Sequence, residues 1–182
     1  MKGKQYVKPI LLVGMFFLLV ALDQFTKFLA VSHLKGKKGV LFIKNILSFE
    51  YLENHGAAWG IFAGKTEFLL IITIIFSIVL CVFIVQIERA LQAGTCKIKL
   101  YTLIQTVLVI LVAGAVGNVI DRIRLSYVVD FIKFEFIDFP IFNVADCYVT
   151  VSSFILLIVV TFFMKDEDFP KKESKKQTNI PS

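Results

Sequence analysis

Two aspartates, Asp130 and Asp146, occupy positions where a carboxylate is costly. Asp130 lies between Val-Val and Phe-Ile, with Lys133 as the nearest basic residue, and Asp146 stands directly before an uncharged apolar run. A carboxylate in such a setting needs either a structural partner or a task, and proton transfer is a task that carboxylates perform well. For Asp146 a structural role is also available, because Asn143 and Asp146 have the spacing of a helix capping box.

Two polar clusters precede the aspartates in the chain. Asp23 and Lys27 are four residues apart, so on a helix they share a face and form either a structural ion pair or a polar wall of a site. The second cluster is Asn-His-Gly-Ala-Ala-Trp-Gly at 54–60, typical of a turn into the next apolar run with Asn54 as a capping residue. His55 is a candidate base, but no Ser or Cys accompanies it in a nucleophile motif, which favours an ordinary loop histidine.

Another polar cluster ends an apolar run, where Asn118, Asp121 and Arg122 are spaced to share one helix face. Gly114 and Gly117 precede them and permit another helix to pack closely there. The cluster is explained either by a helix-end network in which Arg122 pairs with a carboxylate or by support for an active site. The two explanations are compatible.

The composition indicates which elements must position these residues. Of 182 residues, 57% are hydrophobic and 19% are charged, the mean hydropathy is +0.79, and 19 residues are phenylalanine. A soluble core of this size cannot bury so much apolar surface, so we expect an all-α integral membrane protein with a small β-rich element outside the membrane. A disordered chain, a disulfide-stapled module and a separate soluble catalytic domain are disfavoured.

The net charge and the cysteine spacing indicate which partners and ligands to expect. The net charge of +6 comes from basic residues at the termini and beside the apolar runs, which suits lipid headgroups rather than nucleic acid. Membrane lipids are therefore expected partners, and nucleic acid is not. The three cysteines have neither paired nor metal-ligand spacing, so we expect structural cysteines, no metal and no cofactor.

Uncharged apolar runs predict four transmembrane helices, since roughly 20 residues cross a bilayer. The helices are expected at about 8–30, 68–87, 100–120 and 147–164, in a single domain over residues 1–164, followed by a flexible cytoplasmic tail at 165–182. The first run is uncharged only from Pro9 to Leu22 and also resembles a signal peptide. A retained helix is favoured because the apolar pattern continues past Asp23 and Lys27.

Four helices place both termini on the same side of the membrane. That side carries 11 of the 20 Lys and Arg residues against nine on the other, which by the positive-inside rule predicts cytoplasmic termini. All the polar clusters then lie at the outer face. The outer segments 31–67 and 121–146 contain aromatic, partly alternating stretches at 47–52 and 133–137, which predict short strands of a small sheet.

Together the clusters resemble the lipoprotein signal peptidase family, also called type II signal peptidases. The matching stretches occur in the family's order, at the outer ends of the expected helices: DQFTK at 23–27, NHGAAWG at 54–60, GAVGNVIDR at 114–122, YVVDFI at 127–132 and FNVAD at 142–146. Cys147 departs from the pattern, because a small hydroxyl residue such as serine is expected there.

The resemblance implies an aspartic endopeptidase in which Asp130 and Asp146 form the catalytic dyad. Two carboxylates held close together cannot both ionise easily, so one can take a proton from water while the other donates to the scissile carbonyl. The resemblance also implies supporting roles, in orienting the dyad and the substrate, for Asn54, Gly56, Gly114, Asn118, Arg122, Asn143, Asp23, Lys27 and Asp121.

The implied substrate is a prolipoprotein whose cysteine already carries a diacylglyceryl group, cut directly before that cysteine. We therefore expect a monomeric protein of the bacterial inner membrane, with both termini cytoplasmic and its active site at the outer face. Aromatic side chains of the outer segments are candidates for an apolar lid over that site: Phe49, Tyr51, Trp59, Phe134 and Phe136.

The alternative function is a small four-helix transporter that uses the aspartates as proton or cation relays. The aspartates lie at helix ends and not at the midplane, and no predicted helix has a broken middle, which disfavours transport. A non-enzymatic lipid-binding subunit is a further alternative, but it would not need paired aspartates.

Overall fold

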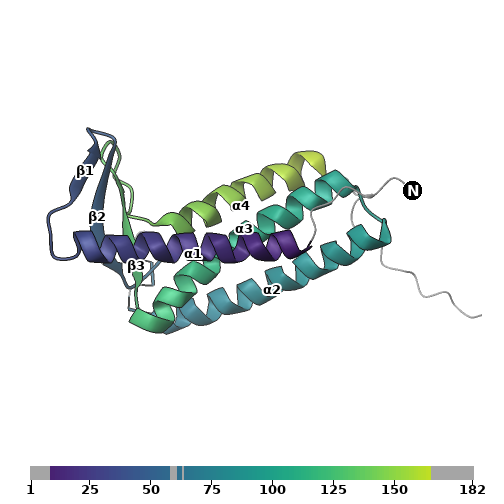
Figure 1. The fold of residues 1–182 in the computed structure, drawn as a ribbon, viewed down its shortest axis with the longest axis horizontal. Helices are drawn as coiled ribbons and strands as arrows, with labels where there is room; N and C mark the ends of the chain where they lie inside the picture. Colours follow the sequence, from purple (N-terminus) through teal and green to yellow (C-terminus); the bar gives the residue numbers. More distant parts are fainter. Residues whose placement is uncertain (1–8, 58–60, 63, 165–182) are drawn as a thin grey trace, which may run out of the picture.

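The computed structural model describes residues 9–57, 61, 62 and 64–164. Four helices make up most of this part of the chain: α1 (Pro9–Leu34), α2 (Thr66–Ala93), α3 (Ile98–Leu125) and α4 (Val144–Phe163). Each is long and apolar enough to cross a membrane. In Figure 1 the helices run along one another, and the strands gather at one end of the bundle.

The helices differ in length from the uncharged runs that predict them. α1 continues through Asp23 and Lys27 to Leu34, because these two charges pair inside the bundle and do not end the helix. α4 begins at Val144, earlier than predicted, because Asn143 caps it. The Asn143 side chain accepts from the Asp146 N–H, and the Asp146 side chain accepts from the Asn143 N–H, so the predicted capping box is confirmed.

α3 is the central helix of the bundle. It packs against α1, α2 and α4 and buries most of its apolar stretch, whereas the other three helices expose most of theirs. The core combines Leu108 and Leu111 of α3 with Leu80 of α2 and Val159 of α4. Exposed apolar side chains on the outer helices suit a lipid environment, where helices satisfy their own backbone hydrogen bonds.

Two glycines of α3 allow the neighbouring helices to come close at the sheet end of the bundle. A Cβ atom at Gly114 would lie 2.6 Å from the carbonyl oxygen of Ala145 in α4, which is too close for any side chain. A Cβ atom at Gly117 would meet the carboxylate of Asp23 in α1. The close helix packing predicted from these small residues is confirmed.

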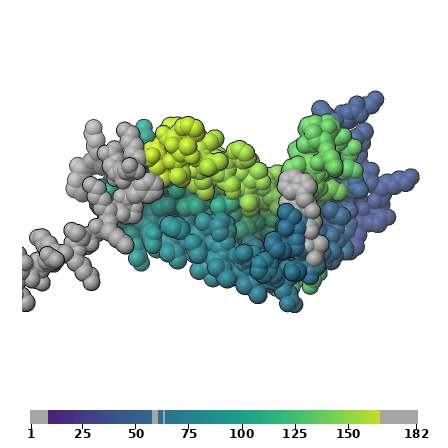
Figure 2. All heavy atoms as spheres, turned by 180° about the vertical axis from the view of Figure 1, so that it is seen from behind, coloured from purple at the N-terminus to yellow at the C-terminus, as the bar shows by residue number. Residues whose placement is uncertain are grey.

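A three-stranded antiparallel sheet covers this end, formed by β1 (Val40–Ile43), β2 (Leu47–Asn54) and β3 (Val128–Phe134) in the order β1-β2-β3. In β2 and β3, Leu52 lies opposite Asp130 and Asn54 opposite Val128. In Figure 2 the sheet and the segment after β3 rise beside the helices, and the surface dips between them and α4. The all-α membrane fold with a small sheet is therefore confirmed.

The placement of the strands was only partly predicted. β2 includes the whole stretch 47–52, but the strand predicted at 133–137 is wrong, because β3 starts at Val128 and ends at Phe134. The pairing of β3 with β2 begins where α3 ends, so Phe136 and Ile137 lie beyond the sheet and are exposed. β1 was not predicted. The earlier start of β3 puts Asp130 inside a paired strand.

Candidate active site

Asn143 brings Asp130 and Asp146 together. Its side-chain Nδ2 donates to Asp130 Oδ1 at 2.6 Å, and its backbone N–H donates to Asp146 Oδ2 at 3.1 Å. Asp130 comes from β3 and Asp146 from the first turn of α4, so a strand and a helix end meet at this asparagine. Asp130 is 1% exposed and Asn143 is fully buried.

Two further asparagines each donate to one of the carboxylates. Asn54 Nδ2 donates to Asp130 Oδ2 at 2.8 Å, and Asn118 Nδ2 donates to Asp146 Oδ1 at 2.8 Å. With the two bonds from Asn143, every carboxylate oxygen of the pair accepts a hydrogen bond from an amide. The positions of both carboxylates are therefore fixed without a metal ion.

Each asparagine side chain is oriented by the bond that its own oxygen accepts. In every case the partner is a group that can only donate: Gly56 N–H for Asn54, Asp146 N–H for Asn143 and Lys27 Nζ for Asn118, at 2.8–3.0 Å. Because these partners take the amide oxygens, the amide nitrogens face the carboxylates. The donors around the aspartates are thus oriented before any substrate binds.

Next to the aspartates, Lys27 lies buried between two other carboxylates. Its Nζ is 3.1 Å from Asp23 Oδ2 and 2.9 Å from Asp121 Oδ2, and the three side chains are at most 4% exposed. Asp23 Oδ1 accepts from the N–H of Ala145 at 2.9 Å, and Asp121 Oδ2 accepts from the N–H of Val129 at 3.1 Å. This buried cluster joins α1 and α3 to the starts of α4 and β3.

Arg122 links α3 to the turn that follows β2. Its Nη2 donates to the carbonyl oxygen of Gly56 at 3.1 Å, while Gly56 N–H holds Asn54. Within the described part of the chain, this backbone contact takes the place of the carboxylate partner predicted for Arg122. Lys133, the basic residue nearest Asp130 in the sequence, pairs with Glu50 at 2.8 Å instead.

The surroundings of Asp130 change its ionisation. Burial, and then the charge of Asp146, raise the pKa of Asp130 to about 7 from its ordinary value of 3.8. The amide donors of Asn54 and Asn143 act in the opposite direction, because they stabilise the ionised form. One proton is therefore available to the pair near neutral pH, which lets two carboxylates supply an acid and a base together.

Comparison with known proteins identifies the family of this chain. The family model described as signal peptidase (SPase) II matches residues 15–163, most of the chain. The chain belongs to the signal peptidase II family. The predicted resemblance is confirmed, and the protein is a membrane-bound signal peptidase of lipoprotein processing in the bacterial inner membrane.

Individual relatives cover nearly the whole molecule. Lipoprotein signal peptidases of Streptococcus pyogenes serotype M1 and serotype M3 (strain MGAS315) are 39% and 38% identical to it over 163 residues, which are 90% of this chain and 99% of theirs. Two solved bacterial membrane enzymes, determined in meso at 2.3 and 1.9 Å, are 34% identical with TM-scores of 0.74 and 0.73. These matches span 92% and 88% of this chain and 99% of theirs. None of these relatives supports the transporter alternative.

All eleven residues singled out from the signal peptidase II motifs lie at the sheet end of the bundle. Hydrogen bonds or ion pairs connect ten of them, and Gly114 contributes close packing. Their roles in catalysis stay predictions. Among the described residues, no group of three or more His, Cys, Asp or Glu side chains is placed to hold a metal ion.

One member of the site was missed in the sequence. Gln24 Nε2 donates to Asp121 Oδ1 at 3.0 Å, to the carbonyl oxygen of Gly117 at 3.1 Å and to Asp23 Oδ2 at 3.2 Å. It therefore closes the buried cluster between α1 and α3. The sequence signal that could have identified Gln24 is an uncharged polar residue beside Asp23 within an apolar helix.

The aromatic residues proposed as a lid have different surroundings. Phe49 and Tyr51 pack with the end of α1, between it and the sheet, which does not support a lid role for them. Phe134 and Phe136 pack against each other with tilted rings whose centroids are 5.5 Å apart, in a cluster that continues to Phe142 beside Asn143. A lid formed by that pair stays a prediction, and Trp59 lies outside the described residues.

Proposed function

We propose that the protein is an aspartic endopeptidase with Asp130 and Asp146 as its catalytic dyad. The observation that supports this most directly is the shared Asn143, which donates to one oxygen of each carboxylate. The other two oxygens accept from Asn54 and Asn118, so both side chains are held with a proton available near neutral pH. Asp130 is buried, and an amide-bonded carboxylate pair with a buried member suits acid–base chemistry on a peptide bond.

In the proposed mechanism, the ionised carboxylate takes a proton from a water molecule as the water oxygen attacks the scissile carbonyl carbon. The protonated carboxyl donates its proton to the carbonyl oxygen, which gives a neutral tetrahedral diol. The roles then exchange: the carboxylate that gave its proton takes one from the diol, the C–N bond breaks, and the other carboxyl protonates the leaving amine. The pair ends with one proton, as it began.

We propose a prolipoprotein with a diacylglyceryl-modified cysteine as the substrate, cut directly before that cysteine. The relatives named lipoprotein signal peptidases support the prolipoprotein part. The position of the aspartates supports the lipid part. They lie at one end of membrane-length helices beside a sheet whose β1 side chains are all exposed and apolar. A peptide bond reaches water there while acyl chains stay in the bilayer.

The same proposal includes the orientation and the extent of the enzyme. Residues 1–164 form one monomeric peptidase domain in contact with membrane lipids, both termini are cytoplasmic, and residues 165–182 form a cytoplasmic tail outside the described residues. The excess of Lys and Arg on the side of the termini supports this orientation. In Figure 1, α1 starts and α4 ends at the end of the bundle away from the sheet. With cytoplasmic termini, this arrangement supports an active site at the outer face.

The test gives purified protein a diacylglyceryl-modified prolipoprotein and follows release of the signal peptide. Asp130→Asn and Asp146→Asn are each expected to lower the rate by about 10²–10⁴-fold or more, since each removes a proton-transfer group. Asp138→Asn, at an exposed position after β3, is the matched control and should keep wild-type activity. Full activity in either dyad variant, with folding intact, contradicts the proposal.

The pH dependence provides an independent test of the same dyad. A pair that must hold one proton is inactive when both carboxyls are protonated and when both are ionised, so kcat/KM should follow a bell-shaped profile. The fall on the alkaline side is expected near pH 7, where Asp130 loses its proton. A rate that stays constant from pH 5 to pH 9 contradicts a shared proton.

A further inference from the structure

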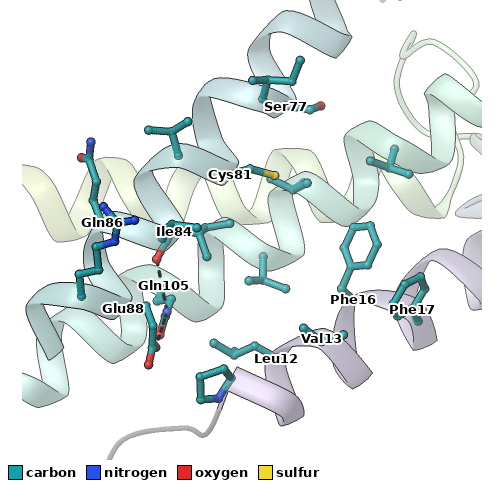
Figure 3. Close-up of a pocket in the computed structure, with 18 of the residues that line it drawn as sticks. Leu12, Val13, Phe16, Phe17, Ser77, Cys81, Ile84, Gln86, Glu88 and Gln105 are labelled. Carbon is teal, nitrogen blue, oxygen red and sulfur yellow. Dashed lines mark hydrogen bonds between the residues drawn. The ribbon is translucent and has the colours of Figure 1, made fainter. Parts of the chain in front are cut away.

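A groove runs along α3 between α1 and α2. Its volume is about 1080 Å³, and its wall is apolar over most of its length. In Figure 3, Leu12 and Phe16 of α1 face Cys81 and Ile84 of α2 across it. An apolar groove between two membrane helices has the shape and chemistry to bind an apolar helix or a lipid chain. The residues that line its two ends distinguish between these occupants.

One end of the groove reaches the level of the proposed dyad along α3. Val116 and Val119 of α3 line it there, and Val119 follows Asn118, whose amide donates to Asp146. The other end is lined by Gln105 of α3 and Glu88 of α2. Along α3, at 1.5 Å per residue, Gln105 lies about 20 Å from Asn118. Along α3, the groove thus extends from the level of the proposed dyad to a polar pair near the opposite end of the bundle.

The polar pair of Gln105 and Glu88 can accept further hydrogen bonds. Gln105 is 2% exposed, and its Nε2 donates to Glu88 Oε2 at 3.0 Å. The Oε1 atom of Gln105 is buried and has no hydrogen-bond partner among the described residues. Such an oxygen is costly unless a bound group donates to it. Among the described residues, Gln92 donates to one oxygen of Glu88 and Gln105 to the other, and a carboxylate can accept further bonds. A group that binds beside Gln105 Oε1 must therefore be a donor, and the charge of Glu88 favours a cation.

We propose that this groove binds the helix of the signal peptide and that Glu88 and Gln105 bind a lysine or arginine of its basic n-region. The inference rests on the proposed function. A signal peptide has a positively charged n-region followed by about 7–15 apolar residues. As a helix, that apolar segment is about 10–22 Å long, which is comparable to the length of α3 between Gln105 and Asn118.

The charges at this end of the groove favour the n-region over a lipid. A lysine ammonium has three N–H donors, enough for the Glu88 carboxylate and Gln105 Oε1 together. Arg89 also lines this end, but the residue is exposed, so water and salt screen its repulsion of a second cation. A carboxylate beside an unpaired carbonyl oxygen repels the phosphate that every phospholipid headgroup carries.

The experiment compares two diacylglyceryl-modified prolipoproteins that differ only in the n-region, one with lysines and one with glutamines at the same positions. The full-length enzyme is placed in nanodiscs of phosphatidylcholine, so that anionic lipid does not hold the lysines. The wild type is expected to have an about fivefold lower KM for the lysine substrate, with similar kcat, as a partly exposed charge pair allows.

Glu88→Gln should raise KM for the lysine substrate about fivefold and abolish the difference between the two substrates. Arg89→Gln is the matched control at the same end of the groove, and it should keep the difference. Glu88→Lys should reverse the preference, so that a third substrate with glutamates in the n-region is cut with the lower KM. Because this reversal is a gain, a folding defect does not produce it.

The inference is overturned if Glu88→Gln distinguishes the lysine and glutamine substrates as well as the wild type does. Binding of the two synthetic signal peptides, measured by fluorescence anisotropy, makes the same comparison without cleavage. If the wild type cuts neither prolipoprotein, the proposed function fails, and the anisotropy comparison still decides the n-region site. Equal binding of both peptides by the wild type also overturns the inference.

Discussion

Two kinds of ion pair occur at the sheet end of this signal peptidase. In the buried cluster, Lys27 lies between Asp23 and Asp121, with side chains at most 4% exposed. The exposed pairs each include a residue of the sheet, and their side chains are 35–50% exposed: Lys35–Glu53 and Lys133–Glu50. The nitrogen–oxygen distances are all 2.8–3.1 Å, so the two kinds differ in burial and not in geometry.

The difference in burial gives the two kinds different tasks. An exposed pair gains little, because water solvates both charges when they separate. A buried charge is costly without its partner, so the buried cluster holds its elements in one arrangement. Lys27 also donates to Asn118, which leaves the Asn118 amide nitrogen to face Asp146. The buried cluster therefore connects the fold to the proposed dyad, and the exposed pairs do not.

The largest effect is expected for Lys27→Met, which removes the cation and leaves Asp23 and Asp121 buried together. The free energy of unfolding should fall by about 3–5 kcal/mol, and signal-peptide release should be lost because Asn118 is no longer oriented. Lys35→Met, just past the end of α1, is the matched control and should change neither property appreciably. Denaturant unfolding measures the stability, and the cleavage assay measures the activity. Equal losses in the two variants would contradict the distinction between the buried cluster and the exposed pairs.

A second test concerns the other buried charge, Asp130. Because its pKa is raised to about 7 in the folded protein, it binds more protons folded than unfolded between about pH 4 and pH 7. Its contribution to stability therefore decreases as pH rises through this range. At pH 8, Asp130→Asn should be more stable than the wild type by on the order of 2–4 kcal/mol, with little difference near pH 4.

Thermal unfolding across this pH range measures the effect, with Asp138→Asn as the control for removal of one carboxyl. An Asp130→Asn variant that is less stable than the wild type at pH 8 would show that the amide donors outweigh burial at this carboxylate. Asp130 would then resemble a satisfied structural charge more than a proton donor held at a cost in stability.

Local spacing in the sequence predicted the parts of the site that lie within one helix turn. The pair Asp23–Lys27 and the capping box of Asn143 and Asp146 follow from helical periodicity alone. The bond from Asn54 to Asp130 joins residues 76 positions apart, and no periodicity specifies it. The resemblance to a family, and not the spacing, indicated that these residues belong together.

The strands show a different limit of prediction. The first four residues of β3, from Val128, are buried in succession, so they have no alternation of apolar and polar side chains and do not resemble a half-buried strand. β1 has the opposite problem, because all four of its residues are exposed. β2 has mixed burial and was predicted. The period-two signal is thus informative only where one face of a strand is covered.

Gly117→Ala tests how closely the buried cluster is packed. The added Cβ would meet the Asp23 carboxylate, so the variant should lose about 1–3 kcal/mol of unfolding free energy and part of its activity. Gly14→Ala in α1 is the matched control, since nothing lies within 4 Å of its added Cβ, and it should gain about 0.5–1 kcal/mol. A gain at both positions would mean that Asp23 moves without cost.

The smallest effect is expected for the exposed pair of Lys133 and Glu50. Their hydrogen bond raises the pKa of Lys133, so the pair stabilises the fold at neutral pH and loses this effect as pH rises through the lysine range. With side chains 38% and 46% exposed, a double-mutant cycle of Lys133→Met and Glu50→Gln should give about 0.5 kcal/mol of coupling, which disappears in 1 M salt. A coupling above about 1.5 kcal/mol that persists in salt would show that this part of the sheet is shielded from water in the working enzyme. Burial by bound lipid would then extend to the sheet, and the exposed pair would behave like the buried cluster.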